Sequence, residues 1–195
     1  MVNATLEMFG QPATYIRMRS MIKRFSYGVH CLLLGSLLLA AMAQSVVAGP
    51  IAPKFTAVSL DGKSVGSASL AGKAYIVNFF ASWCPPCRAE VPDMVLLQSK
   101  YASKGFTFIG MAVSDGEPAI REFAKNNRIN YPVVMASDQL VSSFSKYADG
   151  GINGIPTSFV VNSSGRIIQV IVGARSKDVF EKLILEALRK PGTTK

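Results

Sequence analysis

The sequence predicts one α/β domain in which a mixed sheet carries helices on both faces. Three observations lead to this prediction. Apolar strands alternate with helical patterns from residue 74 to residue 147, two strands joined by a short turn follow, and a helix with a regular apolar stripe comes last. Strands separated by helices are expected to be parallel, whereas strands joined by a tight turn are antiparallel. With 49% hydrophobic and 17% charged residues, the composition fits a folded domain and excludes a disordered chain.

The first part of this domain combines a linker with a strand extension. Gly49-Pro-Ile-Ala-Pro53 is a linker by composition, and residues 54–60 form an expected edge strand that the turn at Asp61-Gly62 ends. Residues 74–80 form an apolar run of strand length, and residues 106–113 are expected to form a second buried strand. Such runs are typical of strands that are buried on both faces of a parallel sheet.

Proline residues and capping residues mark the helices between these strands. Pro85 and Pro86 suit the first turn of a helix, where a missing N–H costs nothing. Pro92 lies inside the same helix and predicts a kink. Ser114 or Asp115 is expected to cap a second helix.

The last third of the domain is predicted to contain a short strand, a short helix, a hairpin and a final helix. Ser176 is expected to cap the final helix and Pro191-Gly192 to end it. Apolar residues three and four positions apart give this helix its buried face. They are Phe180, Leu183, Ile184, Ala187 and Leu188. The other expected bounds are 131–135 for the strand, 138–147 for the helix, and 157–161 and 166–172 for the hairpin.

Residues 1–48 are predicted to be an amino-terminal extension that carries an export signal. Four basic residues precede an uncharged apolar run at 31–43, and small-residue cleavage sites end at Ala43 and Ala48. The run is shorter than the roughly 20 apolar residues that cross a membrane, which favours a cleaved secretory signal. Extending it to Ala48 nearly reaches that length, so a membrane anchor that is not cleaved stays open. The basic residues are Arg17, Arg19, Lys23 and Arg24.

The charged, histidine and cysteine residues exclude several classes of function. The net charge of +9 is carried in part by residues 1–48, so the domain at 49–195 is only mildly basic and no nucleic-acid partner is expected. His30 is the only histidine and, like Cys31, it precedes the domain. The domain therefore lacks the ligands of a closed zinc site and the histidine of a serine or cysteine hydrolase. Its chemistry depends on two thiols and on carboxylates.

The motif Trp83-Cys84-Pro-Pro-Cys87 directly follows a predicted buried strand and opens a predicted helix. Unpaired N–H groups and the dipole at a helix start stabilise negative charge, so Cys84 is expected to be the acidic, attacking thiol. Cys87 lies one turn deeper, where burial keeps a thiol protonated. The spacing predicts a two-step exchange in which Cys84 attacks a disulfide and Cys87 then releases the partner, which closes a Cys84–Cys87 disulfide. Export places this dithiol where disulfides persist.

Two segments of the chain resemble the thioredoxin superfamily, and more closely its exported TlpA/ResA-like branch. They are residues 78–92, which contain the motif, and residues 154–161, which begin Gly154-Ile-Pro-Thr. The resemblance covers roughly residues 50–190. It implies a thioredoxin-like fold with an added N-terminal strand region, no bound cofactor, and reduction of disulfides in client proteins of the bacterial periplasm or cell envelope. A membrane disulfide reductase is the implied electron donor, and cytochrome c maturation and copper-site assembly are the typical pathways.

The resemblance also implies roles for individual residues. Pro156 matches the cis-proline that faces the dithiol, and Ile155 matches the residue whose backbone hydrogen bonds to an incoming peptide. Pro92 matches a kink proline with a structural role, as expected for Pro85 and Pro86 also. Trp83 is expected to shape the substrate-binding surface beside Cys84.

Glu90 matches an acidic residue that follows the second cysteine by three positions in this branch. It lies one turn below Cys87 on the same helical face, and if it is buried its pKa rises and it can take the proton of Cys87 during the second step. The alternative is a carboxylate that only interacts with the helix dipole. Asn78 stands where ordinary thioredoxins carry a buried aspartate, and an amide accepts no proton, so Glu90 is the one carboxylate expected near the pair.

Two other functions stay open at this stage. The motif does not fix the direction of exchange, so an oxidant of the same fold that forms disulfides is an alternative to the reductase. Two thiolates also suit Cu(I), which makes a Cu(I)-binding metallochaperone module a second alternative, although no Met or His flanks the pair. A membrane partner is expected only through an anchor that is not cleaved.

Overall fold

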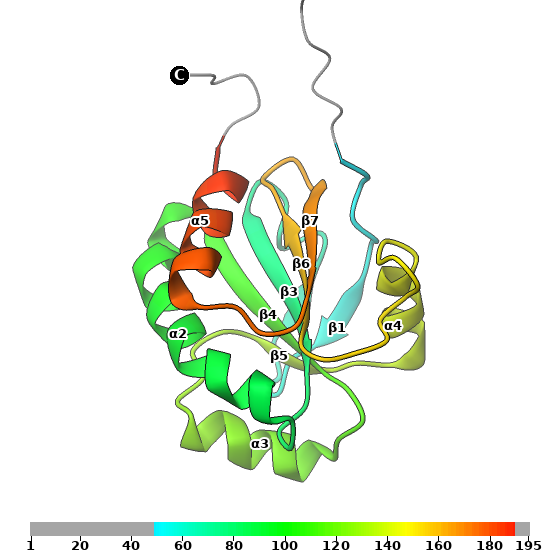
Figure 1. The fold of residues 1–195 in the computed structure, drawn as a ribbon, viewed down its shortest axis with the longest axis vertical. Coiled ribbons are helices and arrows are strands. Elements are labelled where there is room, and N and C mark those ends of the chain that lie inside the picture. The colour runs from blue at the N-terminus through cyan, green and yellow to red at the C-terminus, as the bar shows by residue number, and fades with distance from the viewer. Residues whose placement is uncertain (1–48, 190–195) are drawn as a thin grey trace, which may run out of the picture. The chain divides into compact units, whose positions relative to one another are not determined.

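The computed structural model describes residues 49–189. The signal or anchor predicted within residues 1–48 and the helix stop predicted at Pro191-Gly192 lie outside the described residues. In the described part, five strands form one mixed sheet in the order β5-β4-β3-β6-β7 (Figure 1). Its strands are β3 (Ala74–Phe80), β4 (Phe106–Ala112), β5 (Val133–Met135), β6 (Thr157–Val161) and β7 (Ile167–Val172).

The pairing within this sheet confirms the predicted combination of parallel and antiparallel strands. β3 and β4 are parallel to one another, as are β4 and β5. β6 runs antiparallel to β3, and β7 returns antiparallel to β6 as the second strand of the predicted hairpin. Both apolar runs at the centre of the sheet are strands, and every residue of β3 is buried.

Helices cover both faces of the sheet, as predicted. α2 and α5 pack against each other and cover one face, whereas α4 lies on the other (Figure 1). On the α4 face, the rings of Phe79, Phe144 and Phe159 pack edge to face, with centroids 5.2 to 5.8 Å apart. The helices are α2 (Pro85–Tyr101), followed by the short 3₁₀ helix η1 (Ala102–Lys104), then α3 (Glu117–Asn126), α4 (Asp138–Ser145) and α5 (Lys177–Ala187).

The amino-terminal strand extension differs from the prediction in its pairing. The edge strand expected at 54–60 is the three-residue β1 (Thr56–Val58), which pairs with β2 (Ser64–Gly66) in a separate hairpin. The end of this segment reaches the main sheet at β5, and the preceding linker reaches it at β7, where the Ile167 N–H donates to the Pro50 carbonyl at 2.8 Å. Ser59 forms an isolated bridge to β5, and the N–H of Leu60 donates to a β5 carbonyl at 2.8 Å. The short, partly polar sequence of β2 gives no strand signal, so the prediction misses it.

The start of α3 also differs from the prediction. Gly116 is the residue before its first turn, and neither Ser114 nor Asp115 caps the helix. Ser114 has a φ of 52°, outside the extended conformation of a cap residue, and the Asp115 carboxylate instead accepts the Ser82 N–H at 2.7 Å. Ser176 does occupy the predicted cap position of α5, without a side-chain hydrogen bond.

Candidate active site

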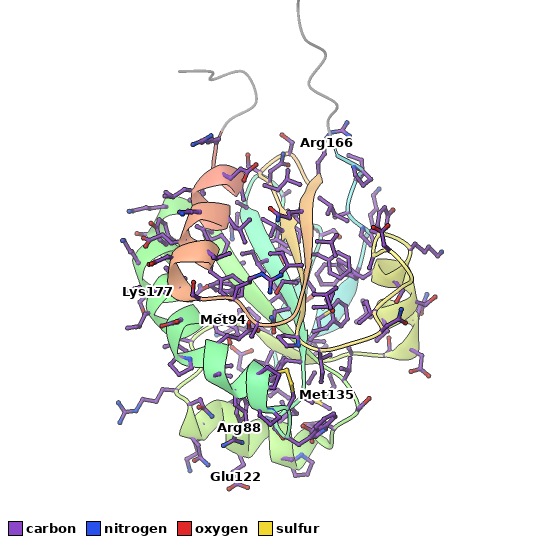
Figure 2. The ribbon with its side chains drawn as sticks, viewed as in Figure 1. Arg88, Met94, Glu122, Met135, Arg166 and Lys177 are labelled. Carbon is purple, nitrogen blue, oxygen red and sulfur yellow. A yellow bond between two sulfur atoms is a disulfide. The ribbon has the colours of Figure 1, made fainter. Side chains whose placement is uncertain are left out.

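The dithiol lies just beyond the carboxyl end of β3, where α2 begins. Cys84 is the N-cap residue of α2, and Pro85 and Pro86 occupy the first helical positions. A disulfide joins Cys84 to Cys87, visible as the yellow bond in Figure 2. The helix continues through Pro92, which is exposed.

The backbone at the start of α2 donates a hydrogen bond to the Cys84 sulfur. The Cys87 N–H donates to Cys84 Sγ at 3.3 Å, so this sulfur holds the position that a capping oxygen holds at other helices. A thiolate formed there gains this hydrogen bond and the favourable end of the helix dipole. Cys84 is 3% exposed and Cys87 is not exposed at all, so Cys84 is the cysteine residue that lies nearer to solvent.

Ile155 and Pro156, which directly precede β6, lie beside the dithiol. The peptide bond between them is cis. The Cys84 sulfur lies 3.8 Å from the carbonyl oxygen of Ile155. The preceding turn is held by Thr157, whose hydroxyl donates to the Gly154 carbonyl at 2.6 Å. The residues that the sequence places 71 positions apart therefore meet in one site.

Trp83 is largely exposed beside the dithiol, and its position is fixed from one side. Its indole N–H donates to the Ser114 carbonyl at 2.9 Å. The neighbouring Asp115 carboxylate accepts the Ser82 N–H, so the β4–α3 loop binds two consecutive residues before Cys84. The sequence motif gave no indication of these contacts, because Ser114 and Asp115 lie more than thirty positions away.

Glu90 is buried on the inner face of α2, between the helix and the sheet, with 2% exposure. The Asn78 side chain of β3 donates one N–H to Glu90 Oε1 at 2.8 Å and the other to the Ser158 hydroxyl at 3.0 Å. The backbone N–H of Arg175 donates to Glu90 Oε2 at 3.3 Å. Both carboxylate oxygens are therefore held, and each by a neutral donor.

Burial raises the pKa of Glu90 from its ordinary value of 4.5 to about 7. The hydrogen bonds from Asn78 and the Arg175 N–H, and the positive charge of Arg175, oppose this rise. Because the carboxyl group titrates near neutral pH, it can take up and release a proton under physiological conditions. A carboxylate that only interacted with the helix dipole at an exposed position would have an ordinary or lowered pKa.

The loop between β7 and α5 is a further part of the site that the sequence patterns did not reveal. It supplies the Arg175 N–H to Glu90, and the N–H of Gly173 donates to the Pro156 carbonyl at 2.8 Å. Gly173 has a φ of +87°, which disfavours any residue with a side chain. Only the fold brings this loop to α2, because Glu90 and Arg175 are 85 positions apart.

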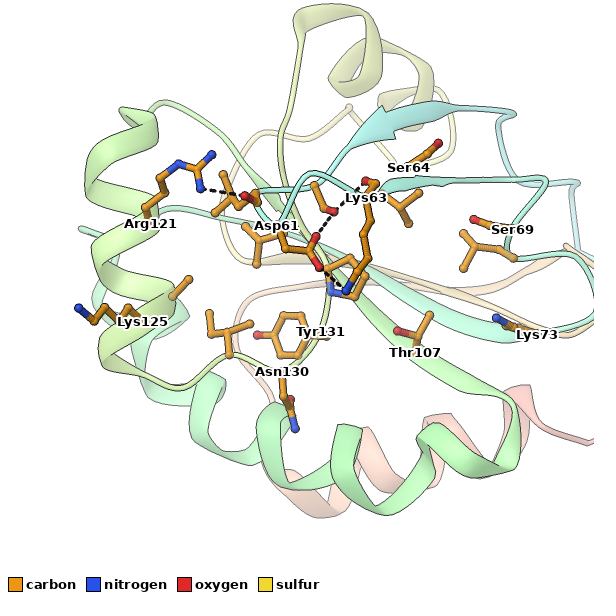
Figure 3. Close-up of a pocket in the computed structure, with 18 residues that line it drawn as sticks. Asp61, Lys63, Ser64, Ser69, Lys73, Thr107, Arg121, Lys125, Asn130 and Tyr131 are labelled. Atoms are coloured by element: carbon orange, nitrogen blue, oxygen red, sulfur yellow. Dashed lines mark hydrogen bonds and ion pairs between the residues drawn. The ribbon is translucent and has the colours of Figure 1, made fainter.

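A cavity lies elsewhere, between the β1–β2 turn, α3 and the start of β5 (Figure 3). It has a volume of about 680 Å³ and lies beside the first residues of β4, which extend beyond the shorter β5. Its charged side chains are exposed, and Asp61 pairs with Lys63 while Arg121 pairs with Glu117. No buried side-chain nitrogen or oxygen in residues 49–189 is left without a partner, so this cavity directs no buried polar group at a ligand.

The fold and the site together define a class of protein. A vicinal dithiol at the start of a helix, a cis-proline against it and a mixed sheet with helices on both faces are the features of a thiol-disulfide oxidoreductase with a thioredoxin-like fold.

Comparisons with known proteins agree with this class. Residues 47–187 match the Redoxin family model. The chain is 31% identical over 134 residues to the thiol-disulfide oxidoreductase ResA of Bacillus cereus, an alignment that covers 68% of this chain and 74% of ResA. It is 28% identical to ResA of Bacillus subtilis over 152 residues, which covers 77% and 80% of the two chains.

A solved structure is also similar. A thiol:disulfide interchange protein of the thioredoxin family from Chlorobium tepidum shares 52% sequence identity and superimposes with a TM-score of 0.71. The match covers 74% of this chain and all of the other. The chain therefore belongs to the Redoxin family, in the TlpA/ResA-like branch of the thioredoxin superfamily, and is a protein thiol-disulfide oxidoreductase. Within residues 49–189, no helix has the length and apolar character needed to cross a membrane.

Proposed function

We propose that this oxidoreductase is exported and reduces disulfides in client proteins. The proposal rests on the different burial of the two cysteine residues and on the buried carboxyl group that follows them in α2. Cys84 is the N-cap of α2 and slightly exposed, Cys87 is fully buried, and Glu90 lies one turn further along the same helix.

In the first step, the Cys84 thiolate attacks one sulfur of the client disulfide. A Cys84–client disulfide forms, and the second client sulfur leaves as a thiolate that takes a proton from solvent. The Cys87 N–H and the start of α2 stabilise the attacking thiolate. Trp83 borders the approach, and the backbone of Ile155 before Pro156 is available to pair with the client segment in an extended conformation.

In the second step, the Cys87 thiol transfers its proton to the Glu90 carboxylate and attacks Cys84 Sγ. The Cys84–Cys87 disulfide closes and the client leaves with its second thiol reduced. Two electrons have then passed from the dithiol to the client. Because burial disfavours a bare thiolate at Cys87, a neighbouring base that shares the burial lowers the barrier of this step.

Regeneration of the dithiol requires a donor of two electrons, and a membrane disulfide reductase suits an envelope protein. The predicted export signal in residues 1–48 and the presence of only one cysteine pair after it support a location in the bacterial periplasm or cell envelope. Apocytochrome c thiols and the thiols of copper-site proteins are the client classes that the family resemblance favours.

Replacing the resolving sulfur tests the proposal. In Cys87→Ser, the second step is impossible, so mixed disulfides between Cys84 and clients should accumulate in envelope extracts and be identified by mass spectrometry. Multiple-turnover reduction of a disulfide substrate should be lost. Cys84→Ser is the matched control, because it retains a buried thiol but lacks the attacking one, and it should trap nothing.

The direction of exchange needs a second measurement. A reduction potential of the Cys84–Cys87 pair near that of thioredoxin, about −270 mV, agrees with a reductase. A potential near about −120 mV, as in a strong periplasmic oxidant, would overturn reduction as the function. Equal trapping by both cysteine variants would overturn the assignment of attacking and resolving roles.

A further inference from the structure

The β7–α5 loop contacts two parts of the active site through its backbone. At one end, the Gly173 N–H donates to the carbonyl of Pro156 at 2.8 Å. At the other end, the Arg175 N–H donates to Glu90 Oε2 at 3.3 Å. Both hydrogen bonds require the loop to keep one backbone conformation. Short irregular segments have few internal contacts, so a further interaction is needed to stabilise that conformation.

The side chain of Arg175 stabilises this conformation. Its guanidinium folds back onto the loop, where one nitrogen donates to the carbonyls of Gly173 and Ala174 at 3.1 and 2.9 Å. The other terminal nitrogen donates to the Val172 carbonyl at 3.2 Å. Three consecutive carbonyls thus converge on one planar, permanently charged group, whose two terminal nitrogens reach positions that the single nitrogen of a lysine cannot occupy together.

We propose that Arg175 is a positioning residue for thiol-disulfide exchange, because its guanidinium holds the β7–α5 loop in the conformation that directs one N–H at Glu90 and another at the Pro156 carbonyl. The inference rests on the proposed role of Glu90 as the proton acceptor for Cys87. Arg175 itself contacts no reacting sulfur in this arrangement. It acts through the loop backbone, and its positive charge adds to the effect on the carboxylate.

The groups that face Glu90 come from several elements. Asn78 of β3 donates directly, with Ser158 of β6 on its other N–H. Tyr131, before β5, is a buried phenol whose pKa is raised by burial and, to a lesser extent, by the charge of Glu90. Cys87 lies one turn away on α2 itself. Among the described residues, Arg175 is the cation that acts on this carboxylate.

Loss of the guanidinium should therefore make Glu90 harder to ionise. In Arg175→Ala the nearby charge is gone and the loop N–H is no longer held against Oε2, and both changes favour the protonated carboxyl. The pH midpoint of the resolving step should rise by about one unit, the effect of losing one hydrogen bond to a charged group. The attack by Cys84 should keep its own pH dependence.

A single-turnover experiment separates the two steps. The reduced full-length chain, carrying Cys31→Ser so that Cys84 and Cys87 are its only thiols, is mixed with one equivalent of dithiobis(nitrobenzoate). Release of the coloured aryl thiolate is followed by stopped flow between pH 5 and pH 9. The first phase reports attack by Cys84, which forms a mixed aryl disulfide and one aryl thiolate. The second reports attack by Cys87, which closes the protein disulfide and releases the second aryl thiolate.

Two other arginine variants serve as references. Arg166→Ala removes a guanidinium that binds a single carbonyl, that of Gly49, at the opposite end of β7 (Figure 2), and it should leave the midpoint of the second phase unchanged. Arg175→Lys keeps the charge without the fork and should shift the midpoint almost as far as Arg175→Ala. If the lysine restores the original midpoint, charge alone is responsible and the positioning role is overturned.

The pKa of Glu90 is also measured directly, by carbon-13 NMR of labelled glutamate in the oxidised full-length chain, with Glu90→Gln identifying the signal. It should rise in Arg175→Ala, and it provides the readout for Arg175→Lys and Arg175→Gln if the alanine variant does not fold. An unchanged or lowered pKa overturns the inference. If instead Glu90→Gln keeps the normal pH profile of the second phase, the proposed proton transfer fails, while the NMR result still decides the role of Arg175.

Discussion

Glu90 and Glu181 carry the same carboxyl group on two helices that pack together, yet their surroundings move its pKa in opposite directions. Glu181 of α5 lies at the surface, where Lys100 and the Tyr101 hydroxyl donate to it at 2.5 and 2.6 Å and lower its pKa. Glu90 of α2 also accepts two hydrogen bonds, but burial raises its pKa to about 7. The number of hydrogen bonds therefore does not decide the protonation state. Burial removes water from a carboxyl group and raises its pKa toward neutral pH when no cation is paired directly with it. Such a group can accept a proton at neutral pH.

The largest expected effect tests whether this difference has a catalytic consequence. Glu90→Gln keeps the shape of the side chain and removes its ability to take a proton, so the second phase of the aryl disulfide reaction should slow about a thousandfold at pH 7. Stopped-flow absorbance gives the rate. Glu181→Gln is the matched control and should react like the unchanged chain. A Glu90→Gln rate within twofold of the original would reduce Glu90 to a structural residue.

A smaller effect is expected on the pH dependence of stability. Since the folded chain binds the Glu90 proton more tightly than the unfolded chain, this residue costs nothing below pH 4.5 and an increasing amount as the pH rises through about 7. The loss totals about 3 kcal/mol of unfolding free energy, from the difference between 4.5 and about 7. Urea denaturation of the oxidised chain should show this decrease, and Glu90→Gln should abolish it.

The Glu181 carboxyl should show the opposite sign in the same measurement. Its pKa is lowered in the folded chain, so its contribution to stability is present above its ordinary pKa of 4.5 and is lost as the pH falls. Glu181→Gln should therefore leave the decrease between pH 4.5 and pH 7 intact. If both glutamine variants flatten the curve equally, the contrast between the buried and the exposed carboxyl groups is wrong.

The smallest effect is expected from removing the cation of the surface pair. Lys100→Gln breaks the contact with Glu181, but exposed ion pairs gain little because water and salt screen both partners. The urea midpoint should be nearly unchanged, and any small decrease should vanish at high salt. A decrease as large as that from Phe79→Ala, which removes a buried side chain, would show that the Lys100–Glu181 pair stabilises the fold more than an exposed ion pair should.

Much of the fold was predictable because its central elements have strong local signals. Six of the seven residues of β3 are apolar, and they predict a buried strand without any knowledge of their neighbours, while the turn at 162–165 predicts the hairpin of β6 and β7. The predicted capping residue of α3 was wrong because of a contact with a distant part of the chain. Asp115 is a good capping residue in isolation, but its carboxylate binds the Ser82 N–H in the active-site loop instead.

The site was predictable to the extent that one helix contains it. The spacing of Cys84, Cys87 and Glu90 places all three groups at the start of α2 from the sequence alone. The position of Pro156 against the dithiol came from the family resemblance, since no local pattern brings it there. The contacts of Arg175 could not be predicted, because backbone N–H groups carry no sequence signature and this one reaches Glu90 across 85 positions.

The unequal lengths of β4 and β5 have a consequence for how the protein behaves when crowded. β5 forms one border of the main sheet but pairs over only three residues, and Ser59 and Leu60 already bind its outer side. Phe108 lies in the part of β4 that β5 does not pair with, and its N–H donates to the Gln98 side chain at 2.8 Å. A second copy of the chain therefore finds almost no free backbone along this border, and strand-by-strand polymerisation is blocked there by the protein's own residues.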